Sequence, residues 1–533
     1  MRSTFSGLNM ALLGLNASQK ALDVTGQNLT NINTAGYTRQ RLDQASISPT
    51  GAEYFNTRYS AKAGQGVLMT GVSQIRDPFL DIRFRNQLSK VGTVDAKDQV
   101  LTNIGEIFDN VDVSTVQNAL DEVGKQLQTI STKVGENGND NLVRSSVEVL
   151  LSYIHQNAVD LNKVRSDLEQ QLKTAVVPDV NQILKSIQEL NGSIKSSQIL
   201  GNPALELKDQ RNALIDDLAT YLPIEVVYGK ETIGSGREVE TLSIKLKGTF
   251  GDPAEEAYLV SDGKSGSLEY VTGADGKAGL KLNYLNGEGD SKADADISDK
   301  LSEGILKGDF DMLNKEGIFD GTQVKGIGYY QKMFDSFVNT LASGLNEMNT
   351  FRDADGNILY NGGALFETSD GSDVFTAENI KVSDGWMNGT VKLVPSENAV
   401  IEGNTDADNI LKMKAFLSTE KITFYAYDKD GNQILGKDGK PIVVFEGNMP
   451  SAYANIQAEQ GIEKMASKAI LENHITVLSN AADARDSVMG VNLDEEVMNL
   501  MRYQQSYSAA ARLMTVMDEA LDKLINGTGV VGR

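Results

Sequence analysis

A seven-residue repeat of apolar positions marks the N-terminal end of the chain. It runs through the first thirty residues, and a second row is offset from it by three positions. This spacing predicts one apolar stripe along an amphipathic helix. Gly36 can adopt the left-handed conformation that closes a helix, so we expect the helix to end near this residue. The first row comprises Leu8, Leu15, Leu22 and Leu29, and the second comprises Ala11, Ser18, Thr25 and Ile32.

The C-terminal end carries a second and clearer heptad repeat. Gly490 is expected to end one helix, Asn492 to cap the next, and Glu495 to complete a capping box. The pattern therefore predicts a long amphipathic helix that begins at about residue 493. Its two apolar rows comprise Leu493, Leu500, Tyr507, Met514 and Leu521, and Tyr503, Ala510, Met517 and Leu524.

The first half of the interior is mainly helical. Residues 37 to about 85 lose the helical period, so we expect extended or irregular chain there. The 3.6-residue period returns between about residues 89 and 222 and predicts a helical bundle or coiled-coil rod. We expect Pro178 to interrupt this helical stretch, because proline lacks the backbone N–H that a helix needs.

From Ile224 the apolar residues alternate, which predicts a β-rich region. Residues 286–308 are polar and acidic and are expected to form a loop. Helix is predicted again from Ile327, then a mixed region with a β-hairpin at 420–446, and helix from Ala452. Asp-Gly pairs provide the positive φ that tight hairpin turns require. These pairs are Asp262-Gly263, Asp275-Gly276, Asp430-Gly431 and Asp438-Gly439.

The order of these segments is nearly palindromic. We therefore predict an α+β multidomain fold with terminal amphipathic helices forming a coiled coil, a long helical-bundle rod domain and inserted β-rich outer domains. A length of 533 residues also favours several domains. The predicted division is a terminal helical assembly domain at 1–60 plus 490–533, a rod domain at 61–223 plus 322–419 plus 447–489, a β-rich outer domain at 224–321, and a hairpin insertion at 420–446.

Composition narrows the possible functions. The chain holds 50 Lys and Arg against 73 Asp and Glu, a formal charge of -23, which disfavours nucleic-acid binding. It contains no cysteine, and its two histidines lack the spacing of a metal site. No apolar stretch approaches the length of a membrane-spanning helix, so we expect no membrane insertion. A cleaved signal peptide is not expected either.

Three patterns superficially resemble catalytic or ligand-binding motifs. Gly263-Lys264-Ser265 lacks the upstream glycine of a phosphate loop, and the sequences around Gly356 and Gly431 lack the acidic ligands of a calcium loop. The neighbouring acids Asp494 to Glu496 diverge around a helix, so they cannot flank one glycosidic bond. We therefore predict no catalytic residues, no metal and no cofactor.

The terminal stripes allow two interpretations. They can form an ordinary two-helix coil inside a monomer, or they can pack against other copies. Pairing buries one face of each helix, whereas Leu12 and Met501 lie beside the stripes and would still be uncovered. These additional apolar residues favour an assembly.

Both ends also resemble a known family. The N-terminal segments around Ala21-Leu22-Asp23-Val24-Thr25-Gly26-Gln27-Asn28 and Asn33-Thr34-Ala35-Gly36-Tyr37-Thr38-Arg39-Gln40 resemble those of flagellar rod, hook and junction proteins. The C-terminal segment Gly490-Val491-Asn492-Leu493-Asp494-Glu495-Glu496, followed by Arg502-Tyr503-Gln504-Gln505, is similar to the FlgK family of hook-filament junction proteins. Asp209-Gln210-Arg211-Asn212 resembles a segment of the rod domain in the same family.

This resemblance implies a structural subunit of the bacterial flagellum, extracellular at the hook-filament junction. It implies self-assembly in a helical lattice, with hook protein FlgE on one side and junction protein FlgL on the other. It also implies type III export without a cleaved signal, with the chaperone FlgN bound beforehand to Leu500, Tyr507, Met514 and Leu521. Asn28, Asn31, Gly36 and Tyr37 would shape the end of the first helix. The two leucine-rich rows, with Tyr503, Met517 and Leu524, would carry the packing between subunits.

Two other functions remain as alternatives. A flagellar hook or distal rod protein would share the terminal helices but differ at Arg502 to Gln505. A secreted peptidoglycan hydrolase would need paired carboxylates in a cleft, for which no sequence signature is found.

Overall fold

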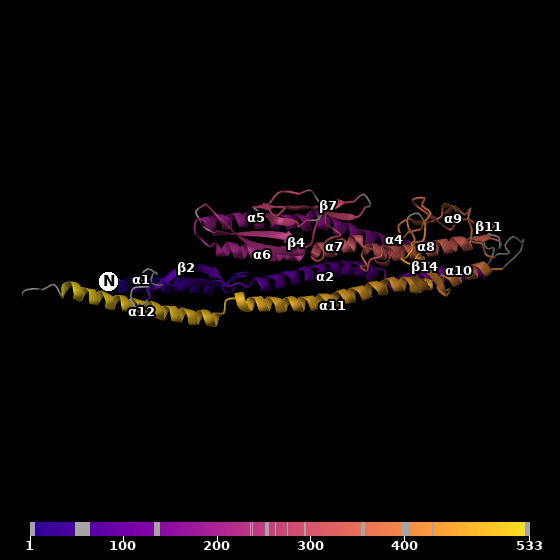
Figure 1. Cartoon of the computed structure of the whole chain (residues 1–533). Coiled ribbons are helices and arrows are strands. Elements are labelled where there is room, and N and C mark those ends of the chain that lie inside the picture. Colours follow the sequence, from indigo (N-terminus) through magenta and orange to yellow (C-terminus); the bar gives the residue numbers. More distant parts are fainter. Residues whose placement is uncertain are drawn as a thin grey trace, which may run out of the picture.

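The molecule is long and narrow, and its first and last helices lie together at one extremity (Figure 1). The structure is a computed structural model. It describes residues 6–47, 64–132, 139–234, 236, 238–250, 255–261, 263–273, 276–292, 295–352, 358–396, 406–428 and 431–527.

The narrow extremity consists of two helices and one hairpin. Helices α1 (Ser6–Thr30) and α12 (Leu493–Asn526) pack along each other. Strands β1 (Gln40–Ser46) and β2 (Val67–Gln74) pair antiparallel and pack on α1. The extended chain that we predicted after the first helix is confirmed for this hairpin.

Two long helices, α2 (Pro78–Asn110) and α11 (Met449–Met489), run side by side through the body. The expectation of non-helical chain up to about residue 85 is wrong, because α2 begins at Pro78. Asp77 caps this helix by accepting a hydrogen bond from the Phe79 amide at 2.9 Å, and proline is favourable at the first helical position.

More helices cover one side of this pair. Helices α3 (Val113–Ser131) and α8 (Ile327–Met348) pack on α11, α4 (Asn139–Gln171) packs on α2, and α10 (Asp408–Ser418) packs on α3. In the core, the Tyr453 ring lies 6.1 Å from the Phe334 ring and 6.0 Å from the Phe337 ring, centroid to centroid. The predicted helical rod is therefore confirmed, with one continuous hydrophobic core.

Pro178 does not interrupt the rod. Helix α4 continues through a π-helical segment, η2 (Leu172–Val176), into α5 (Val177–Ile199). Pro178 lies in the first turn of α5, immediately after the π segment. A π turn is wider than an α turn, so it can accommodate the proline ring and the missing N–H without ending the helix.

The β-rich region lies over α5 and α6 (Leu205–Tyr221). Its first strand begins at Ile224, where we predicted the change of period. A four-stranded antiparallel sheet has the order β3 (Ile224–Thr232), β4 (Glu238–Leu246), β5 (Tyr258–Ser261) and β6 (Lys264–Ser265). A three-stranded sheet has the order β7 (Ser267–Thr272), β8 (Ala278–Asn283) and β9 (Ala295–Asp296).

The turn predictions in this region are partly confirmed. Gly263 and Gly276 have φ values of 71° and 78° and lie between paired strands, and Gly263 therefore belongs to a hairpin turn and not to a phosphate loop. The preceding Asp262 and Asp275 lie outside the described residues. The predicted loop at 286–308 is wrong at two places, because it contains β9 and the start of α7 (Ile305–Asn314), whose apolar residues complete the core.

The opposite extremity carries small hairpins and short helices. A 3-10 turn, η3 (Gly317–Phe319), precedes α8. The pairs are β10 (Thr350–Arg352) with β11 (Ile358–Asn361), β12 (Phe366–Thr368) with β13 (Ile380–Val382), and β14 (Ile422–Tyr425) with β15 (Val443–Gly447). Helix α9 (Asp384–Asn388) buries Trp386. The last pair confirms the predicted hairpin; Asp353 to Gly356 and Asp430 lie outside the described residues.

Long helices with several small sheets confirm the predicted α+β fold class. The division into domains stays a prediction, because the hydrophobic core runs without a break from the helical rod into the β-rich region.

Candidate assembly interface

We call the contact between α1 and α12 the seam. Small residues of α1 lie there at close range to α12. A Cβ atom built on Gly7 would lie 1.9 Å from Met517 Cε, and one built on Gly14 would lie 3.8 Å from Ala510 Cβ. The second contact is seven residues later on α1 and seven residues earlier on α12. The helices are therefore antiparallel and keep one heptad register.

The buried face of α1 consists mostly of small side chains. Ala11 and Ala21 are each 2% exposed, and such short side chains let two helices approach closely. The buried residues are Ala11, Ala17, Ser18, Ala21, Val24, Thr25 and Asn28. The predicted leucine row lies beside this seam and is half-buried. It comprises Leu8, Leu15, Leu22 and Leu29.

Helix α12 covers α1 with larger side chains but leaves much of its own surface in solvent. The half-buried members of the predicted rows are Leu500, Tyr503, Met514, Met517 and Leu521. Three other members are more exposed: Leu493 at 53%, Tyr507 at 36% and Leu524 at 54%. Further apolar side chains lie on the same helix with 42–63% exposure. They are Val497, Met498, Met501, Leu513 and Val516 at 42%, 63%, 54%, 48% and 59%.

A buried polar cluster closes the inner end of the seam. The Asn28 side-chain amide donates to the Gln40 carbonyl at 2.9 Å and to Glu496 Oε2 at 3.3 Å. Its oxygen accepts from the Tyr37 hydroxyl and from the Gln40 amide, both at 2.9 Å. Asn28 is 1% exposed, so this set of bonds satisfies a polar side chain that would be costly to bury alone.

Arg39 joins this cluster to the start of α12. Its guanidinium contacts Glu496 Oε1 at 2.7 Å and Glu495 Oε2 at 2.8 Å, and its backbone amide donates to the Met489 carbonyl at 2.9 Å. Glu496 is 2% exposed, so the pair is desolvated and sensitive to loss of either partner. Arg39 therefore links the chain after α1 with the last residue of α11 and the first turn of α12.

The cap of α12 is partly as we predicted. The Asn492 side chain accepts from the Asp494 and Glu495 amides at 2.9 and 3.3 Å, which confirms the cap. Gly490 follows the last residue of α11, as expected. Glu495 extends to Arg39 instead of completing a capping box, because the guanidinium offers a charge-assisted bond.

The first helix ends earlier than predicted. It stops at Thr30, where the Asn31 amide bonds back to the Gln27 and Asn28 carbonyls at 3.2 and 3.3 Å. Gly36 does have a positive φ of 76°, but it lies in the turns that follow the helix. The Asn31 side chain donates to the Gln27 carbonyl at 2.9 Å.

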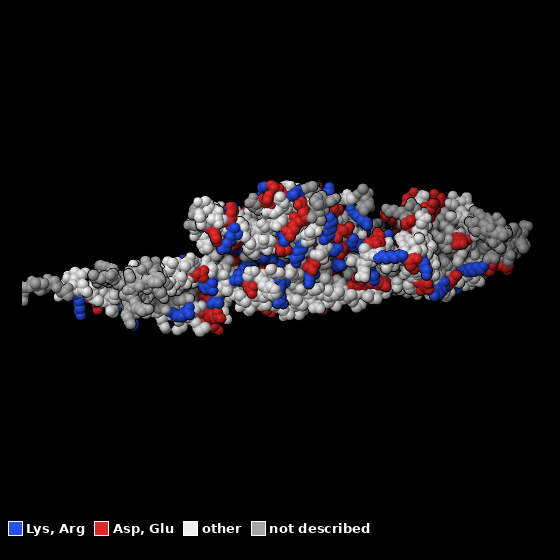
Figure 2. Space-filling model, in the orientation of Figure 1, with Lys and Arg blue, Asp and Glu red and all other residues white. Residues whose placement is uncertain are grey.

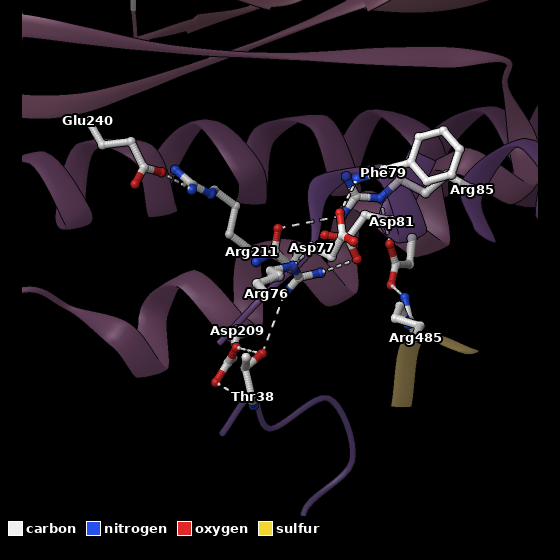
Figure 3. Close-up of polar contacts among 12 residues, drawn as sticks. Thr38, Arg76, Asp77, Phe79, Asp81, Arg85, Asp209, Arg211, Glu240 and Arg485 are labelled. Atoms are coloured by element: carbon white, nitrogen blue, oxygen red, sulfur yellow. Dashed lines mark hydrogen bonds and ion pairs between the residues drawn. The ribbon is translucent and has the colours of Figure 1, made fainter. Parts of the chain in front are cut away.

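A second set of polar contacts fastens this segment to the rod (Figure 3). Asp209 of α6 accepts from the Thr38 amide at 3.1 Å and from its hydroxyl at 2.6 Å. Nearby, Arg76 pairs with Asp81, 3% exposed, in the first turn of α2, at 2.5 and 2.9 Å. The terminal helices are thus held to the body by directed bonds in addition to the chain itself.

Asp216 is shared between two arginines from different helices. Arg85 Nε of α2 lies 2.6 Å and Arg485 Nη1 of α11 lies 2.7 Å from its two carboxylate oxygens. The Arg485 guanidinium also lies 3.7 Å above the Phe84 ring centroid, a cation–π contact. This carboxylate therefore ties α2, α6 and α11 together just below the terminal helices.

Burial and the acidic side chains around the cluster keep the Tyr37 phenol neutral. Burial, with added repulsion from Asp209, Glu206 and Glu496, raises the pKa of Tyr37 above its ordinary value. Burial also raises the pKa of the Asp209 carboxyl, against the opposing effect of its bonds from Thr38. Tyr37 therefore stays a hydrogen-bond donor to Asn28 at any physiological pH.

Sequence reasoning missed Arg39, Asp209, Asp216 and Glu496 as parts of the site. Glu496 looked like one of three solvated acids in a first helical turn. The available signal was the family resemblance, whose segments contain Arg39, Asp209 and Glu496 but give no contact between them. Such long-range ion pairs become visible only when the two ends of the chain meet.

The described residues offer no group of three or more His, Asp or Glu side chains that could hold a metal ion. His155 bonds the Ile380 carbonyl at 2.8 Å, and His474 bonds Gln87 at 3.0 Å, so each has a structural contact. Within the same described part, no helix is both long and apolar enough to span a membrane.

Three family models match the chain. One described as the flagellar hook-associated protein FlgK helical domain matches residues 101–366. Those for the flagella basal body rod protein and the flagellar basal body rod FlgEFG protein C-terminal match 8–38 and 486–527. The two terminal models thus coincide with the seam of α1 and α12.

Several relatives span the whole chain. Flagellar hook-associated protein 1 of Bacillus subtilis is 30% identical and covers 100% of both chains. The proteins of the same name from Escherichia coli and Salmonella typhimurium are 24% and 22% identical, each covering 97% of this chain and 99% of the relative. A solved structure, the flagellar hook junction protein FlgK from Burkholderia pseudomallei, aligns over 53% of this chain and 46% of its own, with a TM-score of 0.40 and 20% identity.

The match to the hook-associated proteins therefore extends from end to end, whereas the rod-protein models match the two ends alone. The chain belongs to the FlgK family, the flagellar hook-associated proteins 1, and is a structural protein of the bacterial flagellum.

Proposed function

We propose that this protein forms the junction between hook and filament, and that α1 and α12 build it by packing against the same helices of neighbouring copies. The observation that carries this proposal is the surface of α12. Its apolar residues continue around the helix after α1 has covered one face, and five of them are 42–63% exposed. A surface of this kind is typical of a protein–protein contact.

The uncovered residues are distributed along the helix. Val497 and Met501 lie one turn apart near its start, and Leu513 and Val516 lie on successive turns further on. Covering one such half-exposed side chain contributes roughly 1 kcal/mol, so neighbours that cover all of them gain several times that amount. Contacts between different faces of identical subunits generate helical lattices instead of closed dimers.

Charge distribution supports the same assignment. Helix α1 contains a single lysine and a single aspartate in 25 residues. In the view of Figure 2, charged side chains are spread over the body, and the described part of the terminal extremity shows fewer of them. Low charge reduces the desolvation that packing requires, so α1 is well suited to burial between helices.

The polar cluster has a positioning role in this proposal. Asn28, Arg39 and Glu496 fix the register of α1 against α12, and Asp209 fixes their base on the rod. Each copy would then present its terminal pair at one angle, which a regular lattice requires. The predicted roles of Asn28 and Tyr37 at the end of the first helix fit this cluster.

The partners follow from the family and from the position of the junction. Hook protein FlgE would contact one side of the ring of copies and junction protein FlgL the other. Before export through the type III apparatus, without a cleaved signal, the chaperone FlgN would cover Leu500, Tyr507, Met514 and Leu521. The terminal helices would complete their ordering when neighbours cover them, because isolated helices are marginally stable. We propose no enzymatic activity.

The test is complementation of a strain that lacks this gene. Val516→Asp places a charge among the exposed apolar residues of α12, so we expect hooks without filaments and flagellin in the medium. The matched control is Val159→Asp, because Val159 lies on α4 in the body and is 59% exposed, the same exposed fraction as Val516. Electron microscopy and immunoblotting of purified hooks give the result. Normal filaments with Val516→Asp, at a normal level of secreted protein, would contradict the proposal.

A further inference from the structure

An acidic groove of about 590 Å³ lies in the body, between α2, α4 and the start of α7. These helices lie in the middle of the molecule, away from the terminal pair (Figure 1). Its charged walls comprise Asp95, Glu106, Asp160, Asp167, Asp309 and Lys163. Five carboxylates and one amine therefore line the groove, of which Glu106, Asp167 and Lys163 lie at its exposed rim.

Asp309 is buried in this groove without a partner. Its side chain lies on α7, the residue is 6% exposed, and it makes no hydrogen bond or ion pair within the described structure. The lysines nearby in sequence point elsewhere: Lys307 pairs with Asp311 at 2.7 Å, and Lys97 of α2 approaches the same carboxylate at 3.8 Å. Burial, and then repulsion from Asp95, raises the pKa of Asp309 to about 7.

The remaining walls are mixed. Val100 of α2 and Leu168 of α4 form an apolar part and are 3% and 7% exposed. The polar lining residues are Gln99, Asn103, Asn110 and Gln171. The π-helical segment Leu172–Val176 borders the groove, and its last residue, Val176, lines it; a wider helical turn next to a cavity is a frequent feature of ligand sites. The apolar part of the wall suits the stem of a ligand that carries a positive group.

The donor set does not suit a metal ion. The carboxylates come from three helices, and no three acids in the described residues are close enough to hold one. A divalent ion needs several oxygen ligands at 2.0–2.6 Å. An ammonium or guanidinium group instead pairs with one or two carboxylates through hydrogen bonds and tolerates apolar walls along its stem.

We propose that this groove binds an organic cation, an alkylammonium or guanidinium group on a slim apolar stem, which pairs with Asp309 and Asp95. The unpartnered buried carboxylate supplies the charge, and the apolar walls hold the stem. Two sources share this chemistry: a basic side chain of a neighbouring copy, and a free amine. The site is separate from the terminal helices and does not depend on the junction role.

Calorimetric titration of the purified full-length chain with agmatine, in phosphate buffer, tests the site. We expect saturable binding that Asp309→Asn weakens by about tenfold or more, because a buried pair loses its anion. Lys163→Met should instead strengthen binding by about threefold, since it removes a like charge. Glu148→Gln, an exposed acid on α4 outside the groove, is the matched control and should leave the affinity unchanged.

Two results would overturn the proposal. One is equal affinity of wild type and Asp309→Asn for agmatine, with both folded by circular dichroism. The other is Mg²⁺ that binds the wild type and displaces agmatine, which would make the groove a metal site. The opposite shift expected for Lys163→Met keeps the test informative even if Asp309→Asn were misfolded.

Sedimentation distinguishes the two sources. If the cation belongs to a neighbouring copy, the wild type self-associates at high concentration, and both saturating agmatine and Asp309→Asn lower the associated fraction. If it is a free amine, agmatine leaves the sedimentation unchanged. Either outcome supports the site, provided that the calorimetric difference between wild type and Asp309→Asn is found.

Discussion

The molecule contains two long helix pairs that differ in what covers them. Helices α2 and α11 are packed under α3, α4, α6, α7 and α8, whereas in the described part of the chain α12 packs mainly on α1, and α1 packs mainly on α12 and on the β1–β2 hairpin. Along α11 eight side chains are buried, among them Tyr453, but along α12 Glu496 is the single buried one in the described structure. Helix α11 therefore has one face in the core, whereas α12 has almost no buried face. On its other face α11 also leaves apolar side chains 38–70% exposed, namely Ile462, Met465, Ile470, Ile475, Val477 and Val488.

This difference shows that a heptad spacing of apolar residues predicts an amphipathic helix, but it does not identify the surface that buries the apolar face. In the body, the partner is the same chain. At the extremity, the chain supplies half of the partner, and we propose that neighbouring copies supply the rest. The following predictions test the contrast, from the largest expected effect to the smallest.

Phe337→Ala should cause the largest loss. The Phe337 ring packs between Phe334 and Tyr453 and is 1% exposed, so we expect a destabilisation of about 3–5 kcal/mol. Thermal unfolding followed by circular dichroism measures it. Leu500→Ala, in the half-buried seam of the terminal pair, is the comparison and should lower the melting temperature far less. Equal losses would show that the seam of α1 and α12 is as buried in solution as the core around Tyr453 of α11.

Asp309→Asn should reduce the pH dependence of the protein's stability. The pKa of Asp309 is about 7 in the folded protein and 3.8 in the unfolded chain. The stability that protonated Asp309 contributes is therefore fully present below pH 3.8 and is lost as the pH rises towards 7. At pH 8 the variant should be more stable than wild type by roughly 2–4 kcal/mol, and at pH 4 by almost nothing. Melting temperatures at several pH values in amine-free buffer give the two curves. Parallel curves would refute the assignment.

Glu496→Ala should loosen the terminal pair while leaving the body intact. It removes the buried partner of Arg39 and Asn28, at a local cost of about 1–3 kcal/mol. Hydrogen exchange should rise in the first turns of α12 and in residues 28–40, with no change in α2 or α11. Glu519→Ala, an exposed acid on the same helix, is the control. Unchanged protection in Glu496→Ala would mean that the cluster does not hold the seam.

Gly14→Ala should have the smallest effect, and it should be favourable. The added Cβ would lie 3.8 Å from Ala510 Cβ, an ordinary contact, and alanine favours a helix by about 0.8–1.0 kcal/mol over glycine. Gly14→Leu adds four carbons at the same position and should separate the helices. Exchange rates of α1 should fall in the first variant and rise in the second. The same change in both would place Gly14 outside the seam.

The sequence predicted most elements because each one has a local cause. Alternation from Ile224, the Asn492 cap and the final hairpin depend on near neighbours in the chain. Errors occurred where a local rule had an alternative outcome: Pro178 is accommodated by a π turn, and Pro78 begins a helix within the stretch that we expected to be extended or irregular. The terminal helices were predicted, but the side chains buried on α1 are small residues beside the leucine row.

By itself, then, the sequence determined which segments are helical or extended, where their apolar faces lie, and to which family the chain is similar. Only the tertiary structure decided which faces meet. Asn28, Arg39 and Glu496 acquire a role because the chain folds back and brings residues more than 450 positions apart into hydrogen-bond distance. The periodicity of apolar residues is a property of one helix at a time, whereas the pairing of helix faces depends on the whole three-dimensional arrangement.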